Sequence, residues 1–136
     1  STSEAQIWAE DAVGPLLSAK NLFALARGYD FPTALETALK LMECALIPCK
    51  GYSTADFQHG PKALAGPQSL VIAFGEAPEV PCPIVQAPIP PAQVGHDAMK
   101  PLWNIVYGQY LALAVARRLG LDPDNPPNLH KITSTL

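Results

Sequence analysis

The sequence lacks the features that mark several large classes of protein. It has no apolar run approaching the roughly 20 residues that a membrane-spanning helix needs. No charge of one sign dominates, because 9 basic and 12 acidic residues give a formal net charge of −3. This balance predicts neither a nucleic-acid surface nor an anionic-membrane surface. Residues 1–13 are acidic and have neither the basic start nor the apolar core of a signal peptide.

Cysteine is also scarce. The three cysteines, Cys44, Cys49 and Cys82, are an odd number at spacings that match no zinc-binding pattern. We therefore expect free thiols in a reducing cytoplasm, with no metal and no cofactor. With 136 residues, of which 49% are apolar, the chain is long enough to fold as one domain around a core without disulfides.

Proline, in contrast, is abundant and clustered. Six of the 15 prolines lie between Pro78 and Pro91, and three more lie in residues 122–127. Neither stretch can form a regular helix, because proline removes an amide donor and clashes with the preceding turn. In the proline-rich part of the chain, His96 stands beside Gly95 and Asp97, where a polar group at a helix start is a simpler reading than a metal ligand.

Short apolar runs predict buried strands. Leu22–Ala26 is the clearest, residues 69–75 are a second, and residues 83–88 are a weaker third. Two helical patterns alternate with them, and this alternation predicts an α/β fold with three layers and an open, mostly parallel sheet.

The first predicted helix starts at Pro32 and stops before Pro48, and the last runs from Pro101 to Gly120. In the first helix the apolar residues form one stripe, at positions 34, 35, 38, 39, 42, 45 and 46. No hydroxyl-rich turn of the kind that binds phosphate precedes either helix.

Glu36, Lys40 and Glu43 are four and three residues apart, so they share one face of the first predicted helix. One interpretation is a solvated face with an ion pair. The other is a site, because this helix begins at the carboxyl end of a parallel strand, where ligands of open α/β sheets bind. His59, before Gly-Pro in what reads as a loop, is likewise either a polar loop residue or an acid–base group on a constrained backbone.

Three segments together resemble a known family. They are "ARGYDFPTALETALKLMECALIPCKGYSTADFQHGPKAL", "DAMKPLWNIVYGQYLALAVARRLGLDPD" and the tail "DPDNPPNLHKITSTL". They are similar to the second sugar-isomerase (SIS) domain of the glucosamine-fructose-6-phosphate aminotransferase family, over residues 22–67 and 97–136. The resemblance implies a flavodoxin-like SIS domain spanning residues 1–136, the second of two in that family.

The resemblance also implies a role for each matching residue. Glu43 matches the carboxylate that moves a proton between C1 and C2 of a sugar 6-phosphate, and Glu36 and Lys40 match its polar partners. His59 matches a histidine that assists ring opening from the neighbouring subunit of a homodimer. Lys131 matches the tail lysine that contacts the sugar carbonyl.

The sequence departs from the family pattern in three ways. It has no Ser/Thr-rich turn for the phosphate, no cysteine nucleophile of a glutaminase domain, and only "EAPEVPC" where the family has a further helix and strand. The sheet is therefore either trimmed or part of a longer protein. The expected function is aldose–ketose isomerisation of a hexose or amino-hexose 6-phosphate, and the alternatives are a fructosamine-6-phosphate deglycase, a non-catalytic phosphosugar-binding module and a structural subunit.

Overall fold

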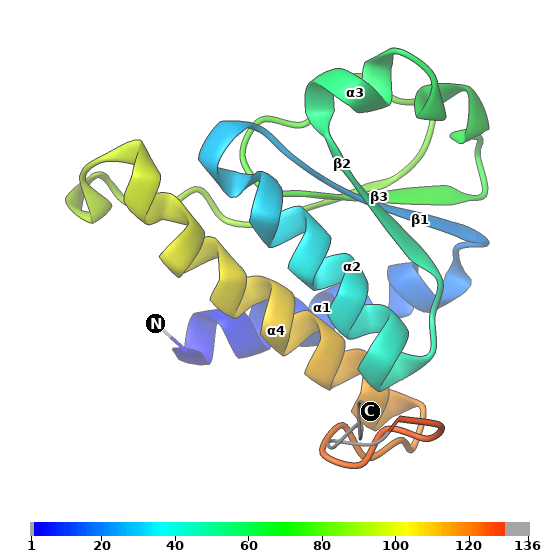
Figure 1. The fold of residues 1–136 in the computed structure, drawn as a ribbon. Coiled ribbons are helices and arrows are strands. Elements are labelled where there is room, and N and C mark those ends of the chain that lie inside the picture. The colour runs from blue at the N-terminus through cyan, green and yellow to red at the C-terminus, as the bar shows by residue number, and fades with distance from the viewer. Residues whose placement is uncertain (1, 130–136) are drawn as a thin grey trace, which may run out of the picture.

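A parallel sheet of four strands, in the order β2-β1-β3-β4, forms the centre of this computed structural model, which describes residues 2–129 (Figure 1). The strands are β1 (Asn21–Ala26), β2 (Cys49–Ser53), β3 (Ser69–Ala73) and β4 (Ile84–Gln86). Each pair of neighbours is parallel. The predicted α/β fold is confirmed, and all three predicted strands are present.

Three long helices cover one face of the sheet, and one short helix covers the other (Figure 1). The long helices are α1 (Thr2–Ser18), α2 (Phe31–Ala45) and α4 (Lys100–Arg118), and the short one is α3 (Thr54–Gln58). Because strand side chains alternate between the faces, every second residue of β1 and β3 packs against the long helices.

Helix α2 has well-defined ends. Pro32 lies in its first turn, where its missing amide costs no hydrogen bond. Leu46 ends it in the left-handed conformation, with φ of 56°. Helix α4 approaches α2 so closely at Gly108 that a Cβ on this residue would collide with Thr37 Oγ1. Since α2 leaves the end of β1 and returns to the start of β2, it runs antiparallel to the strands.

The opposite face carries little covering structure. Phe57 of α3 is fully buried there and packs edge-on against Phe23, with ring centroids 5.3 Å apart. The connection from β3 to β4, residues 74–83, contains no helix and supplies Ala77, Val80 and Cys82 to this small core. Neighbouring parallel strands are usually joined through a helix, so this connection is unusually short.

The sequence reasoning missed three elements. The stretch around His59, predicted to be a loop, contains α3, and the strand β2 directly before it was not predicted. Strand β2 has no apolar run because it lies at the sheet edge, where Lys50 is exposed. Helix α1 was missed because its buried face consists mostly of alanine, and because Pro15 lies inside it. Within residues 2–129 no helix has the length and hydropathy to cross a membrane.

Candidate active site

The three charged side chains predicted on α2 lie together in the structure, and we call Glu36, Lys40 and Glu43 the polar stripe. Lys40 Nζ donates a hydrogen bond to Glu43 Oε2 at 3.1 Å and lies 3.6 Å from Glu36 Oε1. All three side chains are about one third exposed, at 36%, 36% and 33% for Glu36, Lys40 and Glu43. One ammonium group therefore connects two carboxylates on the outer surface of the helix.

The hydrogen bond from Lys40 to Glu43 raises the pKa of Lys40 above its usual value. Partial burial opposes this shift, while the charges of Glu43 and Glu36 add to it. Lys40 therefore stays protonated at neutral pH and neutralises part of the charge of the two carboxylates. Exposed ion pairs of this kind stabilise a fold by less than about 1 kcal/mol, so the polar stripe adds little to the stability of the fold.

The sequence-based expectation placed the polar stripe at the carboxyl edge of the sheet, and for Glu43 the structure corrects it. Helix α2 starts at that edge, but Glu43 lies in its last turns, roughly 18 Å along the axis at 1.5 Å per residue. The side chains of the polar stripe are about one third exposed, so the stripe lies on the outer surface of α2.

The segment after α4 passes the end of α2. Cys44 Sγ, next to Glu43 in sequence, lies 4.0 Å from the carbonyl oxygen of Pro123. Asp122 accepts hydrogen bonds from the Asp124 amide and the Asn125 side chain, both at 2.9 Å, and these bonds lower the pKa of Asp122. The predicted site residue Lys131 lies outside the described residues.

His59 does not lie with the polar stripe in this chain. It caps the C-terminus of α3, where its amide donates to the carbonyl of Asp56 at 3.1 Å, and its side chain is exposed. Helix α3 packs on the small core at one face of the sheet, whereas α2 packs on the large core at the other. The structure therefore brings Glu36, Lys40 and Glu43 together and separates His59 from them.

The start of α3 is a hydroxyl-bearing turn that the sequence reasoning missed. Ser53 Oγ accepts a hydrogen bond from the Asp56 amide at 3.1 Å, and Thr54 Oγ1 is buried without a partner among the described residues. The signal was present, because Ser followed three residues later by an acidic residue is typical of a helix start. However, α3 has only five residues, and the Asp56 carboxylate lies in its first turn and disfavours an anion.

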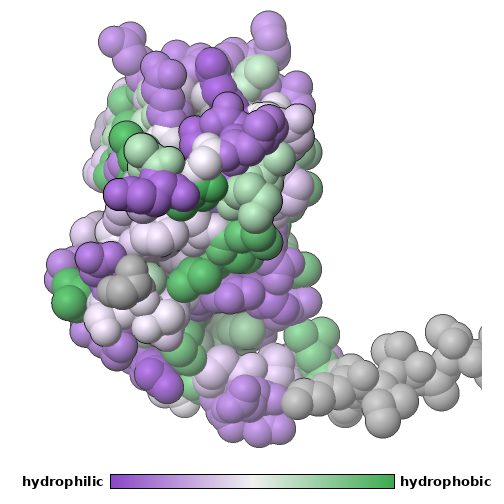
Figure 2. Space-filling model, turned by 90° about the vertical axis from the view of Figure 1, so that its left-hand side faces the viewer, coloured by the Kyte–Doolittle hydropathy of each residue, from purple (hydrophilic) through white to green (hydrophobic). Residues whose placement is uncertain are grey.

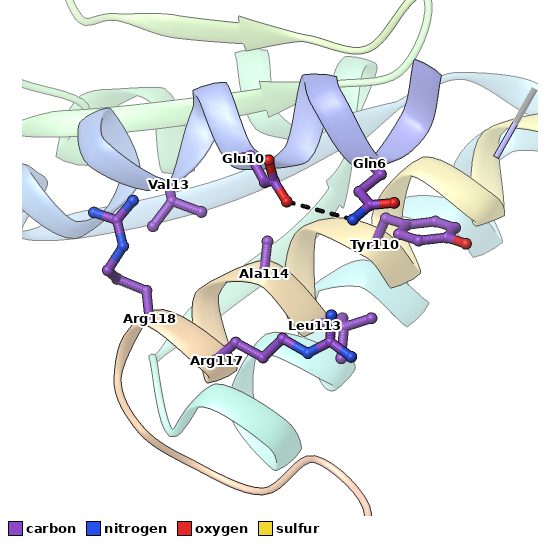
Figure 3. A pocket seen from close by; sticks show the side chains of 8 residues that line it. All are labelled: Gln6, Glu10, Val13, Tyr110, Leu113, Ala114, Arg117 and Arg118. Atoms are coloured by element: carbon purple, nitrogen blue, oxygen red, sulfur yellow. Dashed lines mark hydrogen bonds between the residues drawn. The ribbon is translucent and has the colours of Figure 1, made fainter. Parts of the chain in front are cut away.

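Another candidate is the groove of about 430 Å³ between α1 and α4. Arg117 and Arg118 line it, and Glu10 accepts a hydrogen bond from Gln6 at 3.5 Å. Figure 3 shows that the two guanidinium groups point in different directions, Arg118 toward Val13 and Arg117 along the other side of α4. They do not converge on one point, so the groove lacks the clamp that binds an anion between two arginines.

The carboxyl edge of the sheet carries structural contacts. Asn104 donates from Nδ2 to Asp30 Oδ1 at 2.9 Å and so ties α4 to the start of α2. His96 accepts a hydrogen bond from the Ala98 amide at 3.0 Å, which confirms it as a polar group at a helix start. Figure 2 shows this side of the molecule, where polar residues predominate and apolar residues form separate patches. Among residues 2–129 no group of three or more potential ligands is arranged to hold a metal ion.

Comparison with known proteins places this geometry in a family. Residues 15–81 match the SIS domain family. The chain is an SIS domain protein. Glutamine–fructose-6-phosphate aminotransferase (isomerizing) from Nostoc sp. (strain PCC 9229) is 31% identical over 134 residues, covering 79% of this chain and 21% of the relative. The same enzyme from Chlorobaculum tepidum is 48% identical over 59 residues, covering 43% of this chain and 10% of the relative. This SIS chain thus spans about a fifth or less of these relatives.

Solved structures support the same assignment. Glucosamine-6-phosphate deaminase from Thermotoga maritima superposes with a TM-score of 0.75 at 25% identity, covering 94% of this chain and 45% of that one. The C-terminal domain of glucosamine-fructose-6-phosphate aminotransferase from Francisella tularensis has a TM-score of 0.73 at 19% identity, covering 89% of this chain and 42% of that one. The second likeness shows a shared fold.

The SIS domain here is shorter than the matched part of its relatives. The alignment with the Nostoc enzyme is 134 positions long but uses 79% of the 136 residues, so the relative has roughly 27 additional residues in that stretch. In the structure no helix lies between β3 and β4. Trimming of this segment, one of the two alternatives left open by the sequence, stays a prediction.

Proposed function

We propose that this SIS domain supplies the acid–base groups for aldose–ketose proton transfer on a hexose or amino-hexose 6-phosphate. The observation that carries the proposal is the polar stripe, in which Lys40 holds Glu43 and Glu36 together on an open surface. The relatives, whose names contain fructose 6-phosphate and "isomerizing", supply the substrate class.

The chemistry requires a base that removes a proton from one carbon and returns it to the neighbouring carbon. We assign this role to the Glu43 carboxylate. When the proton leaves C1 of the open-chain ketose, negative charge develops on the C2 oxygen, and a lysine ammonium stabilises it. In the proposal Lys131 contacts that oxygen, Lys40 and Glu36 hold Glu43 in place, and the His59 imidazole relays a hydroxyl proton during ring opening.

The site requires more than one copy of this chain. His59 lies on the opposite side of the sheet from Glu43, so the proposal takes His59 from the second subunit of a homodimer. The phosphate group needs backbone amides and hydroxyls at a helix start. We propose that residues outside this chain provide them, because the Ser53 turn already uses its hydroxyl to cap α3.

A phosphosugar-binding module without turnover is the second candidate. It is favoured by the exposure of the polar stripe, whose three side chains are each about one third accessible to solvent. A deglycase on an amino sugar 6-phosphate would use the same proton transfer, so it differs from the first candidate in its substrate and leaving group rather than in these residues.

The test is Glu43→Gln in the full-length protein, with Glu10→Gln on the exposed surface of α1 as the matched control. Incorporation of solvent deuterium at C1 or C2 of the sugar phosphate is followed by NMR. Loss of a general base lowers the rate by about 10²–10⁴-fold, so exchange should nearly vanish in the first variant and persist in the second. Normal exchange with Glu43→Gln would reject the assignment. Phosphate-dependent binding without exchange in the wild-type protein would favour the sensing module.

A further inference from the structure

The segment that follows α4 makes a hydrogen-bonded turn, here called the exit turn (residues 122–125), at the end of α2 (Figure 1). Leu121, directly before it, packs on the large core. The Asp122 carboxylate closes the turn by accepting hydrogen bonds from the Asp124 amide and the Asn125 side chain, both at 2.9 Å. An aspartate that accepts from the amide two residues on stabilises a turn in this way. One exposed side chain thus sets the direction in which the chain leaves α4.

A second turn follows directly. The Leu129 amide donates to the carbonyl of Pro126 at 3.4 Å, and Asn128, between them, has a φ of 64°. The third position of such a turn requires this left-handed conformation, which asparagine tolerates better than most residues. Lys131 is two residues beyond Leu129, which is at most about 7 Å of extended chain. The two turns therefore set the point from which the segment carrying Lys131 departs.

The exit turn lies beside the polar stripe. The carbonyl oxygen of Pro123 is 4.0 Å from Sγ of Cys44, which follows Glu43 in the sequence. Burial raises the pKa of Cys44, and the Lys40 ammonium opposes this shift. The carboxylates of Glu43 and Asp124 add to the shift. One thiol is therefore influenced both by the polar stripe and by the exit turn, so the two are neighbours.

The charges at this place favour the approach of another cation. The groups that act on Cys44 are the carboxylates of Glu36, Glu43 and Asp124 and the ammonium of Lys40, a net charge of −2 from three negative groups and one positive group. Opposite charges attract more strongly near a protein surface than in bulk water. Lys131 is the single lysine or arginine in residues 119–136. Its charge thus complements the surroundings of Glu43.

We propose that Asp122 is a positioning residue for the reaction, which closes the exit turn and so directs Lys131 to the sugar carbon atoms between which Glu43 moves a proton. This inference rests on the proposed function. Asp122 contacts no reacting atom and acts only through the direction of the chain. Its two hydrogen bonds lower its pKa, so the carboxylate that accepts them stays ionised at neutral pH.

The experiment compares the full-length wild-type protein with Asp122→Ala and Asp122→Asn. Both changes remove the charge, but asparagine keeps an oxygen that accepts from the Asp124 amide, so it is the matched control. Deuterium exchange on the sugar phosphate gives kcat and KM. Because a misplacement of about 1 Å can cost about 10²-fold, we expect kcat to fall about tenfold or more in Asp122→Ala, with a smaller change in KM. Asp122→Asn should stay close to the wild type.

The rate at which iodoacetamide modifies Cys44 is the second readout and needs no activity. In Asp122→Ala it should rise several-fold, since the Pro123 carbonyl is no longer held against the thiol. Cys49 is an internal control for unfolding, because it is 3% exposed and should keep its wild-type rate. Mass spectrometry of digested peptides measures both rates.

Four results would overturn the inference. Wild-type kcat in Asp122→Ala would show that the exit turn positions no group of the reaction. An Asp122→Asn variant as slow as Asp122→Ala would assign the effect to the charge instead of the turn. Equal acceleration at Cys49 would show a general loss of structure. Absence of exchange in the wild-type protein would reject the proposed function together with the positioning role, and this outcome is distinct from a defect confined to Asp122→Ala.

Discussion

The two faces of the sheet differ in how they are covered and in what they carry. Helices α1, α2 and α4 pack on one face over a large core, whereas α3 and the β3–β4 connection cover the other with a small one (Figure 1). The helical face leaves the polar stripe on the outside of α2, beside the exposed apolar side chains of Leu35, Leu39 and Met42. Helix α3, which packs on the small core, carries His59 at its C-terminal end. The polar stripe and His59 therefore lie on opposite faces of the sheet in this chain.

The two coverings are also built differently. Residues 74–83 join β3 to β4 as an irregular segment over the small core, whereas three long helices pack on the other face. The layer that presents the proposed base therefore rests on a large core, while the layer that presents His59 depends on a few side chains.

The largest expected effect is the loss of stability that follows when a buried side chain of the small core is truncated. Phe57 is fully buried and holds α3 against the sheet through Phe23 and Tyr52, with ring centroids 5.3 and 6.2 Å away. Phe57→Ala should therefore lower the free energy of unfolding by about 3–5 kcal/mol, measured by chemical denaturation. Leu41→Ala, in the large core, is the matched control and should cost about 2–5 kcal/mol.

The two variants should differ in which backbone amides lose their protection against hydrogen exchange. Amide hydrogen exchange in residues 54–64 should accelerate in Phe57→Ala while the amides of α2 keep their protection relative to global unfolding. A loss below about 1 kcal/mol in Phe57→Ala would contradict the account, because large buried aromatic side chains cost more when truncated. It would mean that α3 is held by contacts other than those with Phe23 and Tyr52.

A smaller effect concerns the reactivity of two cysteine thiols, one beneath the long helices and one in the small core. Burial raises the pKa of Cys49, beneath the helical layer, to about 12. Burial also raises the pKa of Cys82, in the small core, but this residue is only partly buried. At pH 9 iodoacetamide should therefore modify Cys82 before Cys49, with mass spectrometry of digested peptides as the readout. Equal rates at the two thiols would contradict the difference in covering.

The pKa of Cys49 also sets a pH dependence of stability. In the unfolded chain this thiol ionises near pH 8.5, whereas in the folded chain it stays protonated up to about pH 12. The unfolded state therefore binds fewer protons between these values, and stability falls as pH rises through this window. Cys49→Ala removes this contribution, so its stability should decline less steeply above pH 9. An unchanged slope would contradict the prediction.

The sequence was sufficient for elements in which local pattern and tertiary packing agree. The apolar run of Leu22–Ala26 became the central strand β1, and the proline and glycine signals bounded α2 and α4 within two residues or so. Strand β2 could not be predicted in this way, because an edge strand containing Lys50 and Gly51 has no buried run to detect.

The candidate site was predictable in part. Residue spacing alone placed Glu36, Lys40 and Glu43 on one face of a helix, and the structure confirms that they are close together. Periodicity could not show which half of the apolar stripe faces the core, because that depends on the packing of the sheet and of α4. It also could not show that His59 and Glu43 lie on opposite sides of the sheet, since this depends on the order of the strands.

Complementation between two inactive variants tests whether Glu43 of one copy acts together with His59 of the other. Glu43→Gln and His59→Ala protomers of the full-length protein are mixed, subunit exchange is verified by native mass spectrometry, and deuterium exchange on the sugar phosphate is measured. A heterodimer rebuilds one site with both groups intact, so a 1:1 mixture should recover about a quarter of the wild-type rate while each variant alone stays inactive. Full subunit exchange without any recovery would contradict a site that joins Glu43 of one copy to His59 of the other.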